Sequence, residues 1–436
     1  MRVLKFGGTS VGSPESMRGV ANILKNEAES LVVLSAISGT TNRLAEIAEY
    51  FRSNQEHLAL KEIDVLEGEY KIFIDELIQD AVILKDLTAI LDARFIDLKR
   101  AFVKLQPAEL ERSILAQGEL MSTSIFHRYL KSIGVENHLL NALDVLRLKS
   151  DLEPDSEFLK SALSQEVNAK PGLKIIQGYI CRNAFGEIDN LKRGGSDYSA
   201  SLFGAALSAE EIQIWTDIDG MHNNDPRYVT GTKSIERLSF NEAAELAYFG
   251  AKILHPSSVH PAHVANIPVI LKNTQRPEAK GTRIDMMGSG TGIKAIAAKD
   301  GITAIKVKSG RMLLAYGFLK KIFEVFDWYK TSIDMITTSE VAVSLTIDQN
   351  DQIEHIRADL EKIGSVEIDE NQSIICLVGD ELQELPGLAV NAFSALKEVN
   401  IRMISFGGSK HNISVLVDSK DKVKALQALH ENLFQS

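Results

Sequence analysis

The chain has 436 residues, which is more than one hydrophobic core ordinarily serves, so we expect two or three domains. Hydrophobic residues at 44% and charged residues at 25% are typical of a globular chain. The 59 acidic residues outnumber the 48 basic ones. The net charge of −11 therefore argues against nucleic acid as a partner, and the absence of a polybasic stretch argues against a membrane surface.

The start of the chain and its cysteines favour a cytoplasmic protein. Cys181 and Cys376 lie too far apart for a CxxC motif, and they suggest no disulfide framework. The first residues, MRVLKFGG, contain a lysine and two glycines where a signal peptide would need an apolar core. No apolar run approaches the roughly 18 residues that a spanning helix requires.

The first 51 residues predict two strand, turn and helix units. Residues 2–6 (RVLKF) form a strand pattern, and the glycine turn after them leads to a helix with Ser13 at the N-cap and Pro14 at its first position. Residues 31–35 (LVVLS) form a buried-strand pattern, which is followed by AISGTTN and an amphipathic helix over 43–51. Two such units indicate a parallel sheet covered by helices.

Residues 55–105 hold one glycine and no proline, and their apolar spacing predicts a helical insertion. Strand patterns then return with helices between them, and Ser239 with Glu242 forms a capping box for one helix. These strand patterns cover residues 173–180, 211–218 and 267–273.

The segment GSGTG at 288–292 is the best linker candidate in the chain. After it, the order of strand and helix patterns fits two βαββαβ-like modules better than one large domain. We therefore expect one domain over 1–291 and a separate C-terminal region over 292–436. The modules would cover about 303–375 and 376–436, and residues 292–302 could belong to both.

Several turns between a strand and a helix are suited to bind phosphate, because they point backbone N–H groups and a helix N-terminus at one place. Lys5 precedes the first of them, KFGGTS, and its ammonium could neutralise phosphate oxygens. The sequence contains neither GxxxxGK[ST] nor a full GxGxxG, so this is neither a Walker A loop nor a Rossmann fingerprint. The alternative is a tight turn with a solvated lysine.

A second constellation is RGGSD, in which Arg193 stands four residues before Asp197. A guanidinium beside a carboxylate suits a zwitterion, since the first binds a carboxylate and the second an ammonium group. Ser196 is placed to cap the helix over 198–207. The alternative is a surface ion pair of little energetic value.

Three further places in the sequence fit either a functional role or an ordinary structural role. Thr216 and Asp217 end an apolar strand, where open α/β sheets bind ligands, yet this segment could simply form turns. Glu119 is expected at the start of a helix after Gly118, where the helix dipole alone would explain it. Lys252 could reach phosphate or could be an ordinary exposed lysine. No histidine has the spacing of a zinc site.

Taken together, these motifs resemble those of aspartate kinases in the amino-acid kinase superfamily, and the resemblance covers nearly the whole chain. The tail resembles the tandem ACT modules of the monofunctional, lysine-sensitive type. In chain order, the motifs are KFGGTSVG, SAISGTTN, QGELMS, RGGSDYSA, WTDIDGMHNNDPR, FGAKILHP, GFLKKIFEVFDWYKTSIDMITTSEVAVSLTID and NIRMISFGGSKHNISVLV.

The resemblance implies an α/β fold: a carbamate kinase-like αβα sandwich with a mainly parallel sheet, followed by two ferredoxin-like ACT modules. It implies that ATP phosphorylates the side-chain carboxylate of L-aspartate in the first step towards lysine, threonine and methionine. Mg²⁺ would be bound through the ATP phosphates, with no metal site in the protein itself. A cytoplasmic homodimer or larger homo-oligomer is also expected, because ACT modules commonly pair across subunits.

The resemblance also assigns roles to individual residues. Lys5 and Asp197 would be catalytic, with Arg193 on the α-carboxylate of aspartate and Glu119 on its ammonium group. The aspartate site would comprise Thr41, Glu119, Arg193, Ser196 and Asp197. The nucleotide site would comprise Lys5, Gly7, Gly8, Ser35, Thr216, Asp217, Arg227 and Lys252. An amino-acid effector would contact Met312, Phe318, Asp334, Thr338, Ser339 and Glu340.

The chain departs from the family pattern in three places. Lys192 stands where many relatives have glycine, and His222 with Asn223-Asn224 replaces a tyrosine and two threonines. Leu314-Ala315 stands where lysine-inhibited enzymes have His-Ser, which leaves the identity of the effector open. Two other hypotheses remain: a catalytically weak amino-acid-binding regulatory protein, and a relative that acts on glutamate or acetylglutamate.

Overall fold

The computed structural model describes residues 1–25, 27, 29–104, 107–191, 194–250, 254–310, 316–348 and 350–434, without the side chains of 102–104 and 107–108. These residues form two compact units. The first unit contains Met1–Met221, Glu236–Phe240 and Leu254–Met286. The second contains His222–Ile235, Asn241–Ile253 and Met287–Ser436.

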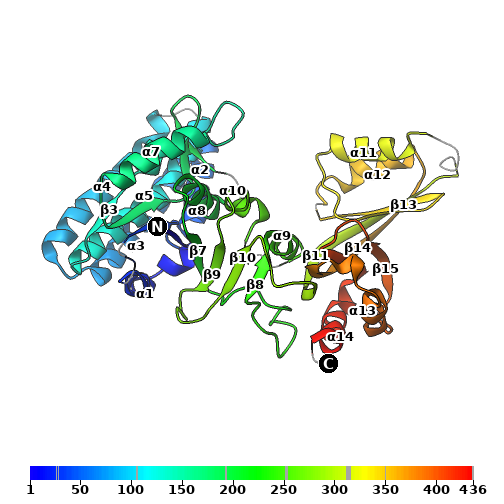
Figure 1. Cartoon of the computed structure of the whole chain (residues 1–436). Coiled ribbons are helices and arrows are strands. Elements are labelled where there is room, and N and C mark those ends of the chain that lie inside the picture. Colours follow the sequence, from blue (N-terminus) through cyan, green and yellow to red (C-terminus); the bar gives the residue numbers. More distant parts are fainter. Residues whose placement is uncertain are drawn as a thin grey trace. The chain divides into compact units, whose positions relative to one another are not determined.

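The first unit is built on an eight-stranded sheet in the order β3-β4-β2-β1-β7-β9-β10-β8 (Figure 1). The pairs β1–β2, β1–β7, β2–β4, β3–β4 and β7–β9 are parallel, and β9–β10 is antiparallel. The mainly parallel sheet predicted from the two N-terminal units is therefore confirmed. The strands are β1 (Arg2–Phe6), β2 (Ser30–Leu34), β3 (Asn137–Leu139), β4 (Leu173–Gln177), β7 (Glu211–Thr216), β8 (Arg237–Ser239), β9 (Val269–Asn273) and β10 (Thr282–Asp285). A separate two-stranded hairpin is formed by β5 (Ile180–Arg182) and β6 (Ile188–Asn190).

Helices cover both faces of this sheet. The two-residue period of β1 points Leu4 and Phe6 into a core that the first five helices cover, and it points Lys5 to the opposite face, where α8 contacts β1. Ser13 accepts a hydrogen bond from Ser16 N–H as the N-cap of α1, and Pro14 follows at the first position, as predicted. The helices of the first unit are α1 (Pro14–Leu24), α2 (Thr40–Arg52), α3 (Glu56–Leu77), α4 (Ala81–Lys104), α5 (Pro107–Ser132), α6 (Ala142–Val145), α7 (Ser156–Asn168), α8 (Gly195–Ala206) and α10 (His260–Val264), and 3₁₀ turns are formed by η1 (Gly8–Val11) and η2 (Pro256–Val259).

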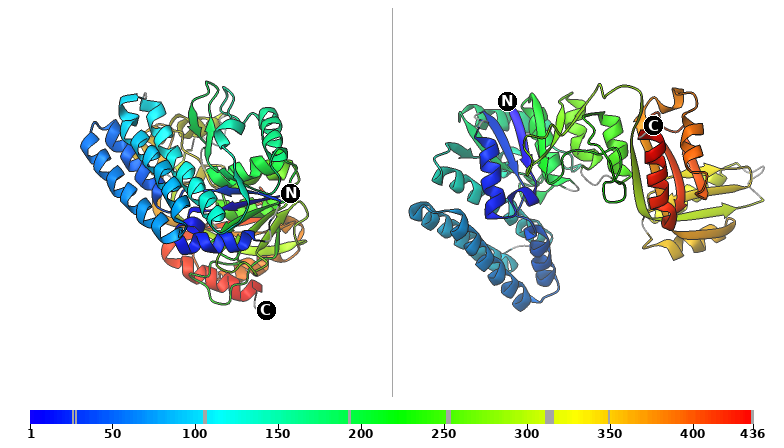
Figure 2. Two further views of the ribbon diagram at one scale, coloured as in Figure 1. Left: turned by 90° about the vertical axis from the view of Figure 1, so that its left-hand side faces the viewer. Right: turned by 90° about the horizontal axis from the view of Figure 1, so that it is seen from below.

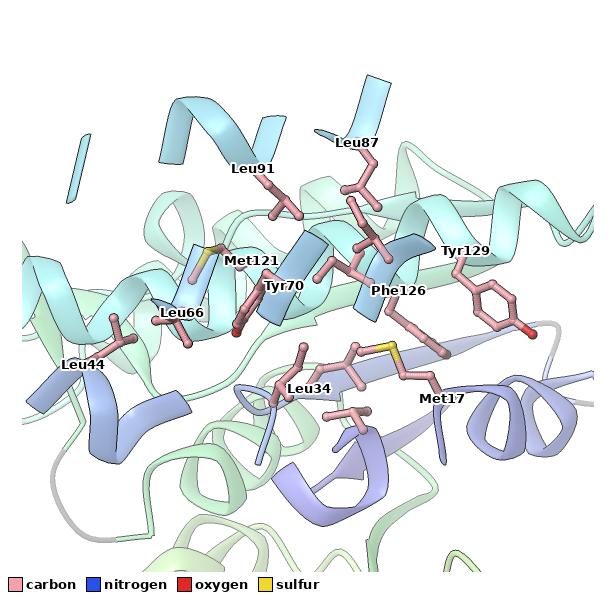
Figure 3. Packing of buried hydrophobic residues seen from close by; sticks show 14 of the residues in the cluster. Met17, Leu34, Leu44, Leu66, Tyr70, Leu87, Leu91, Met121, Phe126 and Tyr129 are labelled. Carbon is pink, nitrogen blue, oxygen red and sulfur yellow. The ribbon is translucent and has the colours of Figure 1, made fainter. Parts of the chain in front are cut away.

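The predicted helical insertion is present as α3 and α4, which lead into α5. These three long helices lie side by side, coloured blue to cyan in Figure 2. Their apolar residues recur at three- and four-residue steps and meet those of α2 and the sheet in one continuous core (Figure 3). Tyr70, Leu91 and Phe126 are among its buried members.

The second unit is built on a six-stranded antiparallel sheet in the order β12-β13-β11-β14-β16-β15. Two apolar cores lie along it, one beneath α11 and α12 and the other beneath α13 and α14. Its strands are β11 (Gly292–Lys308), β12 (Ile336–Thr338), β13 (Ala342–Ile347), β14 (Ser365–Asp380), β15 (Ile401–Phe406) and β16 (Asn412–Asp418), and its helices include α11 (Phe318–Trp328), α12 (Ile353–Glu361), α13 (Leu388–Ala395) and α14 (Lys422–Phe434).

Strands β11 and β14 each pass through both βαββαβ modules. The second half of β11 pairs with β13 and with the first half of β14, whereas its first half pairs with the second half of β14. Irregular register near Lys299 and Ile302 marks the change. Each module therefore has four strands in the order 2-3-1-4, and the first half of β11 is the fourth strand of the second module.

Two stretches that precede β11 in sequence also pack within the second unit. Tyr228 and Val229, from 222–235, join the core beneath α13 and α14. In the other stretch, α9 (Phe240–Tyr248) packs with all but its first residue in this unit. No helix in the described part of the chain is both long and apolar enough to cross a membrane.

Candidate active site

The ion pair between Lys5 and Asp197 is the centre of the candidate site. Lys5 stands one residue before the end of β1, and Asp197 lies in the first turn of α8. Lys5 Nζ is 2.7 Å from Asp197 Oδ1, and the two side chains are only 12% and 17% exposed. The fold thus joins two residues that are far apart in the chain, at the carboxyl end of a central parallel strand, where open α/β sheets bind ligands.

The turn after β1 has little room for side chains at its two glycines. A Cβ atom on Gly7 would lie 3.3 Å from Lys5 Nζ, and one on Gly8 would lie 3.1 Å from the carbonyl oxygen of Ala36. The absence of side chains therefore leaves the Lys5 ammonium accessible beside the backbone of the turn. The helical turn η1 begins directly at Gly8.

The segment after β2 carries the next part of the site. Ser35 follows β2, and its carbonyl oxygen accepts a hydrogen bond from Ser122 Oγ at 2.8 Å. The N–H of Ala36 donates to Glu119 Oε1 at 3.2 Å. Both Ser122 and Glu119 lie on α5, so this helix anchors the segment that leads to Thr41.

Glu119 is a buried carboxyl group with one oxygen unused. The residue is 3% exposed, and its Oε2 has no hydrogen-bond partner among the residues that the structure describes. Burial raises the pKa of Glu119 to about 7, against the lowering effect of the Ala36 N–H. A buried carboxylate with a free oxygen suits an ammonium group.

The expected position of Glu119 at the start of a helix is wrong. It lies in the middle of α5, where the helix dipole has little effect because that effect is confined to the terminal turns. The preceding glycine does not break the helix. A Cβ on Gly118 would lie 2.8 Å from Ala36 Cβ, so glycine here allows α5 to approach the Ala36 segment closely.

The start of α8 is shaped by two more close approaches. The helix begins at Gly195, and its N-cap is Gly194 in a left-handed conformation with φ of 76°. A Cβ on Gly195 would lie 2.2 Å from the Tyr179 ring, and one on Gly178 would lie 2.7 Å from Ser196 Oγ. The prediction that Ser196 caps a helix starting near 198 is therefore wrong, and Ser196 lies in the first turn instead.

Of the predicted aspartate contacts, Thr41 is described by the structure and Arg193 is not. Thr41 is exposed in the first turn of α2, next to the buried Thr40. Arg193 and the neighbouring Lys192 lie outside the described residues. The structure brings together the backbone or side chains of Lys5, Gly7, Gly8, Ser35, Glu119, Ser196 and Asp197 around the ends of β1, β2 and β4 and the start of α8.

Thr216 and Asp217, at the end of β7, line a cavity of about 1130 Å³ in the first unit. Thr9 and Ser10, which lie in η1 just after the glycine turn, line the cavity as well. Lys5 and Asp197 do not line this cavity. The cavity is large enough for a nucleotide.

The other two predicted nucleotide contacts are Arg227 and Lys252. Arg227 lies in the second unit, is exposed, and donates from Nη2 to Asp225 Oδ2 at 2.6 Å. The Asp225 carboxylate raises the pKa of Arg227. Lys252 lies outside the described residues.

The predicted effector residues fall into three groups. Asp334 is buried, with its side chain 1% exposed, and it contacts Lys299 Nζ at 2.7 Å and the Tyr248 hydroxyl at 2.6 Å. Phe318 is buried in the core beneath α11 and α12. Thr338, Ser339 and Glu340 are exposed at the turn between β12 and β13. Met312 and the divergent Leu314-Ala315 lie outside the described residues.

Sequence reasoning missed several residues that shape the site. The backbone of Ala36 positions Glu119, and Tyr179 adopts a left-handed conformation with φ of 65° against Gly195. The glycine within the apolar run LKIIQGYI was a usable signal, because an isolated glycine in a strand pattern often marks a close backbone approach. The local sequence around Lys299 and Asp334 does not indicate that these two residues pair.

Comparison with known proteins agrees with this architecture. The amino acid kinase family matches residues 1–273, and the ACT domain matches residues 375–433. The lysine-sensitive aspartokinase 3 of Escherichia coli strain K12 is 34% identical over 448 residues, which cover 99% of both chains. Aspartokinase 1, chloroplastic, of Arabidopsis thaliana is 34% identical over all of this chain and 80% of its own length.

Two solved structures of E. coli aspartokinase III share the fold. The complex with aspartate and ADP, in the R-state, has a TM-score of 0.82 at 33% identity and covers 100% of both chains. The complex with lysine and aspartate, in the T-state, has a TM-score of 0.83 at 34% identity and covers 100% of this chain and 99% of the other.

The fold and the matches define an amino acid kinase with an appended ACT region. Within that class, the chain belongs to the aspartokinase family, and it is an enzyme with aspartate kinase activity.

Proposed function

We propose that the chain transfers the γ-phosphoryl group of ATP to the side-chain carboxylate of L-aspartate and forms 4-phospho-L-aspartate. The observation that carries this proposal is the Lys5–Asp197 ion pair, 2.7 Å long, beside the glycine turn. The solved complex of the related E. coli enzyme with aspartate and ADP supports an amino acid and a nucleotide as the two ligands of this chain.

The acceptor needs no general base. The side chain of free aspartate has a pKa near 3.9 and is already an anionic nucleophile at neutral pH. The site must instead hold two anions in line and reduce their repulsion, so its main contributions are positioning and positive charge. Lys5 supplies that charge beside the turn, and Asp197 fixes its ammonium group.

Glu119 and Arg193 select the amino-acid end of the substrate. The free oxygen of Glu119 accepts the α-ammonium group, and Arg193 holds the α-carboxylate, in agreement with the sequence motif. The β-carboxylate is then left to face the phosphates. Thr41 and Ser196 complete the aspartate site.

The nucleotide binds next to Thr216 and Asp217, with Gly7, Gly8 and Ser35 near its phosphates. Arg227 and Lys252 are the further basic contacts. The described residues contain no group of three or more His, Cys, Asp or Glu side chains that could hold a metal ion. Mg²⁺ would be carried by the ATP phosphates and water, where it would neutralise phosphate charge.

The second unit binds an amino-acid effector that controls the enzyme. The T-state complex of the E. coli relative with lysine supports an effector of this chemical class. We also propose a cytoplasmic homo-oligomer. Activity assays with lysine, threonine and methionine, singly and in pairs, test the control, and insensitivity to all three would contradict it.

The test of the main proposal is ADP release with L-aspartate and with L-glutamate. We expect turnover with aspartate only, and a loss of about 100-fold or more in kcat/KM for Lys5→Ala and Arg193→Ala. Lys61→Ala, on the exposed face of α3, is the matched control and should retain activity. Absence of aspartate-dependent ADP release in the wild type would refute the proposal. Calorimetric binding of an amino acid without turnover would then favour a regulatory protein.

A further inference from the structure

A pair of buried hydroxyl groups joins the helical insertion to the segment after β2. Tyr70 lies on α3, and Thr40 is the first residue of α2. Tyr70 Oη and Thr40 Oγ1 are 2.9 Å apart, and each residue is 3% exposed. A hydrogen bond between side chains this well shielded from water restricts both helices.

Thr40 is well placed to orient an aspartate contact. The turn of Ser38 and Gly39 precedes it, and the Thr40 N–H closes that turn onto the carbonyl oxygen of Ile37 at 3.0 Å. Thr41 follows directly and is exposed. The direction in which Thr41 points therefore depends on how the first turn of α2 is held.

The same hydroxyl pair lies close to the carboxyl group that we assign to the substrate ammonium. A Cβ on Gly118 would lie 3.5 Å from Thr40 Cγ2, so Thr40 packs against α5 one residue before Glu119. Burial raises the pKa of Tyr70, and the charge of Glu119 raises it further, which indicates that the two side chains are within electrostatic reach.

The Tyr70 ring and its hydroxyl have separable roles. The ring packs edge-on against Phe95, with 5.7 Å between centroids, inside the core shown in Figure 3. Phenylalanine would fill that space equally well. A hydroxyl in such a core is unfavourable unless it is hydrogen-bonded, and Thr40 provides the bond.

We propose that Tyr70 is a positioning residue for the aspartate site: its hydroxyl holds the first turn of α2 so that Thr41 and Glu119 meet the substrate in a fixed geometry. This inference rests on the proposed aspartate kinase reaction. It assigns to the helical insertion a part in substrate binding in addition to its part in the core.

The experiment compares Tyr70→Phe with the wild type in steady-state kinetics with both substrates. We expect the KM for aspartate to rise about tenfold, which is the size of one lost buried hydrogen bond, while the KM for ATP changes less than about twofold. A purely structural role would change both constants together or neither. Thermal unfolding of each variant shows how much folded enzyme the assays contain.

Two further variants complete the design. Thr40→Val removes the other hydroxyl at nearly constant volume, and the double variant should be no worse than either single one, because both remove the same bond. The matched control is Tyr129→Phe, in the same core, whose hydroxyl has no hydrogen-bond partner within the described residues. It should leave both KM values unchanged.

The inference is overturned if Tyr70→Phe keeps the wild-type KM for aspartate, if it raises both KM values equally, or if the two single effects add. These outcomes presuppose a wild type that turns over aspartate. Should the wild type show no aspartate-dependent turnover, the proposed function fails, and this inference fails with it.

Discussion

The charge state of Glu119 links both the stability of the fold and the binding of aspartate to pH. The pKa of this carboxyl group is raised by burial to about 7, above the 4.5 of an exposed glutamate. In the free enzyme, Glu119 therefore favours the folded state most below about pH 4.5. The free energy of unfolding falls as pH rises from about 4.5 to about 7, because the buried group loses its proton. A bound ammonium group reverses this preference, because it favours the carboxylate.

The first prediction concerns aspartate affinity. Between pH 5.5 and 7, wild-type KM for aspartate should fall with rising pH, by up to about tenfold per unit, and it should level off above 7 as Glu119 becomes charged. Glu119→Gln should raise KM and remove this dependence. Initial rates at saturating ATP across the pH range provide the measurement.

The control for this prediction is Glu111→Gln, an exposed carboxylate on the same helix, which should keep the wild-type profile. Free aspartate itself does not titrate in this range, since its side chain ionises near pH 3.9. A flat wild-type profile, or the same slope in Glu119→Gln, would contradict the assignment.

At the scale of single residues, the sequence names candidate site residues but does not show what surrounds them. Lys5 and Asp197 were both named, but their contact depends on the parallel pairing of β1 with β7 and on the path of α8, which no local pattern encodes. The glycine before Glu119 suggests a helix boundary in the sequence, but Glu119 lies within α5. The tight packing of Gly118 against Ala36 is a tertiary requirement.

Among the elements, α1 shows how a local motif sets the start of a helix beside the site. Ser13 Oγ accepts the N–H of Ser16 at 3.1 Å, Pro14 takes the first position, and Glu15 lies in the first turn, where the dipole favours an acid. The helix directly follows η1 and the glycine turn, so its start limits the movement of that turn.

We predict that Ser13→Ala lowers the free energy of unfolding by about 1 kcal/mol, because one N–H at the helix start loses its partner. Urea unfolding followed by Trp215 fluorescence measures it in a Trp328→Phe background, since the buried Trp215 lies in the first unit and the exposed Trp328 in the second. Ser16→Ala leaves the Ser16 N–H bonded to Ser13 and is the matched control. Equal losses in the two variants would exclude the cap as the cause.

Element prediction succeeded where periodicity was continuous. The sequence predicts the insertion over 55–105 from its helical apolar spacing, and it predicts the buried strands from short apolar runs bounded by turn residues. The boundaries shifted where glycine acted in packing, as at Gly195, where Tyr179 occupies the space of a missing Cβ and the helix starts three residues before the predicted position. A single sequence does not show which glycines serve tertiary contacts.

On the scale of the whole molecule, the second unit depends on a buried charge cluster. Lys299 Nζ contacts Asp334 at 2.7 Å and Asp348 at 2.9 Å, and it lies 4.3 Å from the Tyr248 ring centroid. Burial lowers the pKa of Lys299, but the two carboxylates outweigh this effect and raise it overall. The cluster connects β11, the segment before β12, β13 and α9.

Our third prediction is that Lys299→Met destabilises the second unit by about 3–5 kcal/mol, because it leaves the buried charge of Asp334 without its cation. Amide hydrogen exchange of the full chain can locate the loss in this unit. Lys308→Met is the matched control on the same strand, because its partner Glu367 is exposed and such pairs contribute at most about 1 kcal/mol. An effect no larger than that of the control would contradict the prediction.

The βαββαβ repeats were predicted from the order of strand and helix patterns, and their ferredoxin-like strand order is confirmed. The sequence left open whether 292–302 belonged to one module or both. The change of partners along β11 reveals the two halves, because a strand's partners are not encoded in its own pattern of apolar residues.

The shared strand has a consequence for how the chain is synthesised and inherited. The first half of β11 leaves the ribosome before any other strand of its sheet, yet its partner, the second half of β14, follows only after the first module has been translated. A gene fragment that begins after Lys299 would encode a second module with an open edge on β14, which is prone to associate with other strands. Recombination can therefore exchange the two modules together with the start of β11, but not the second module alone.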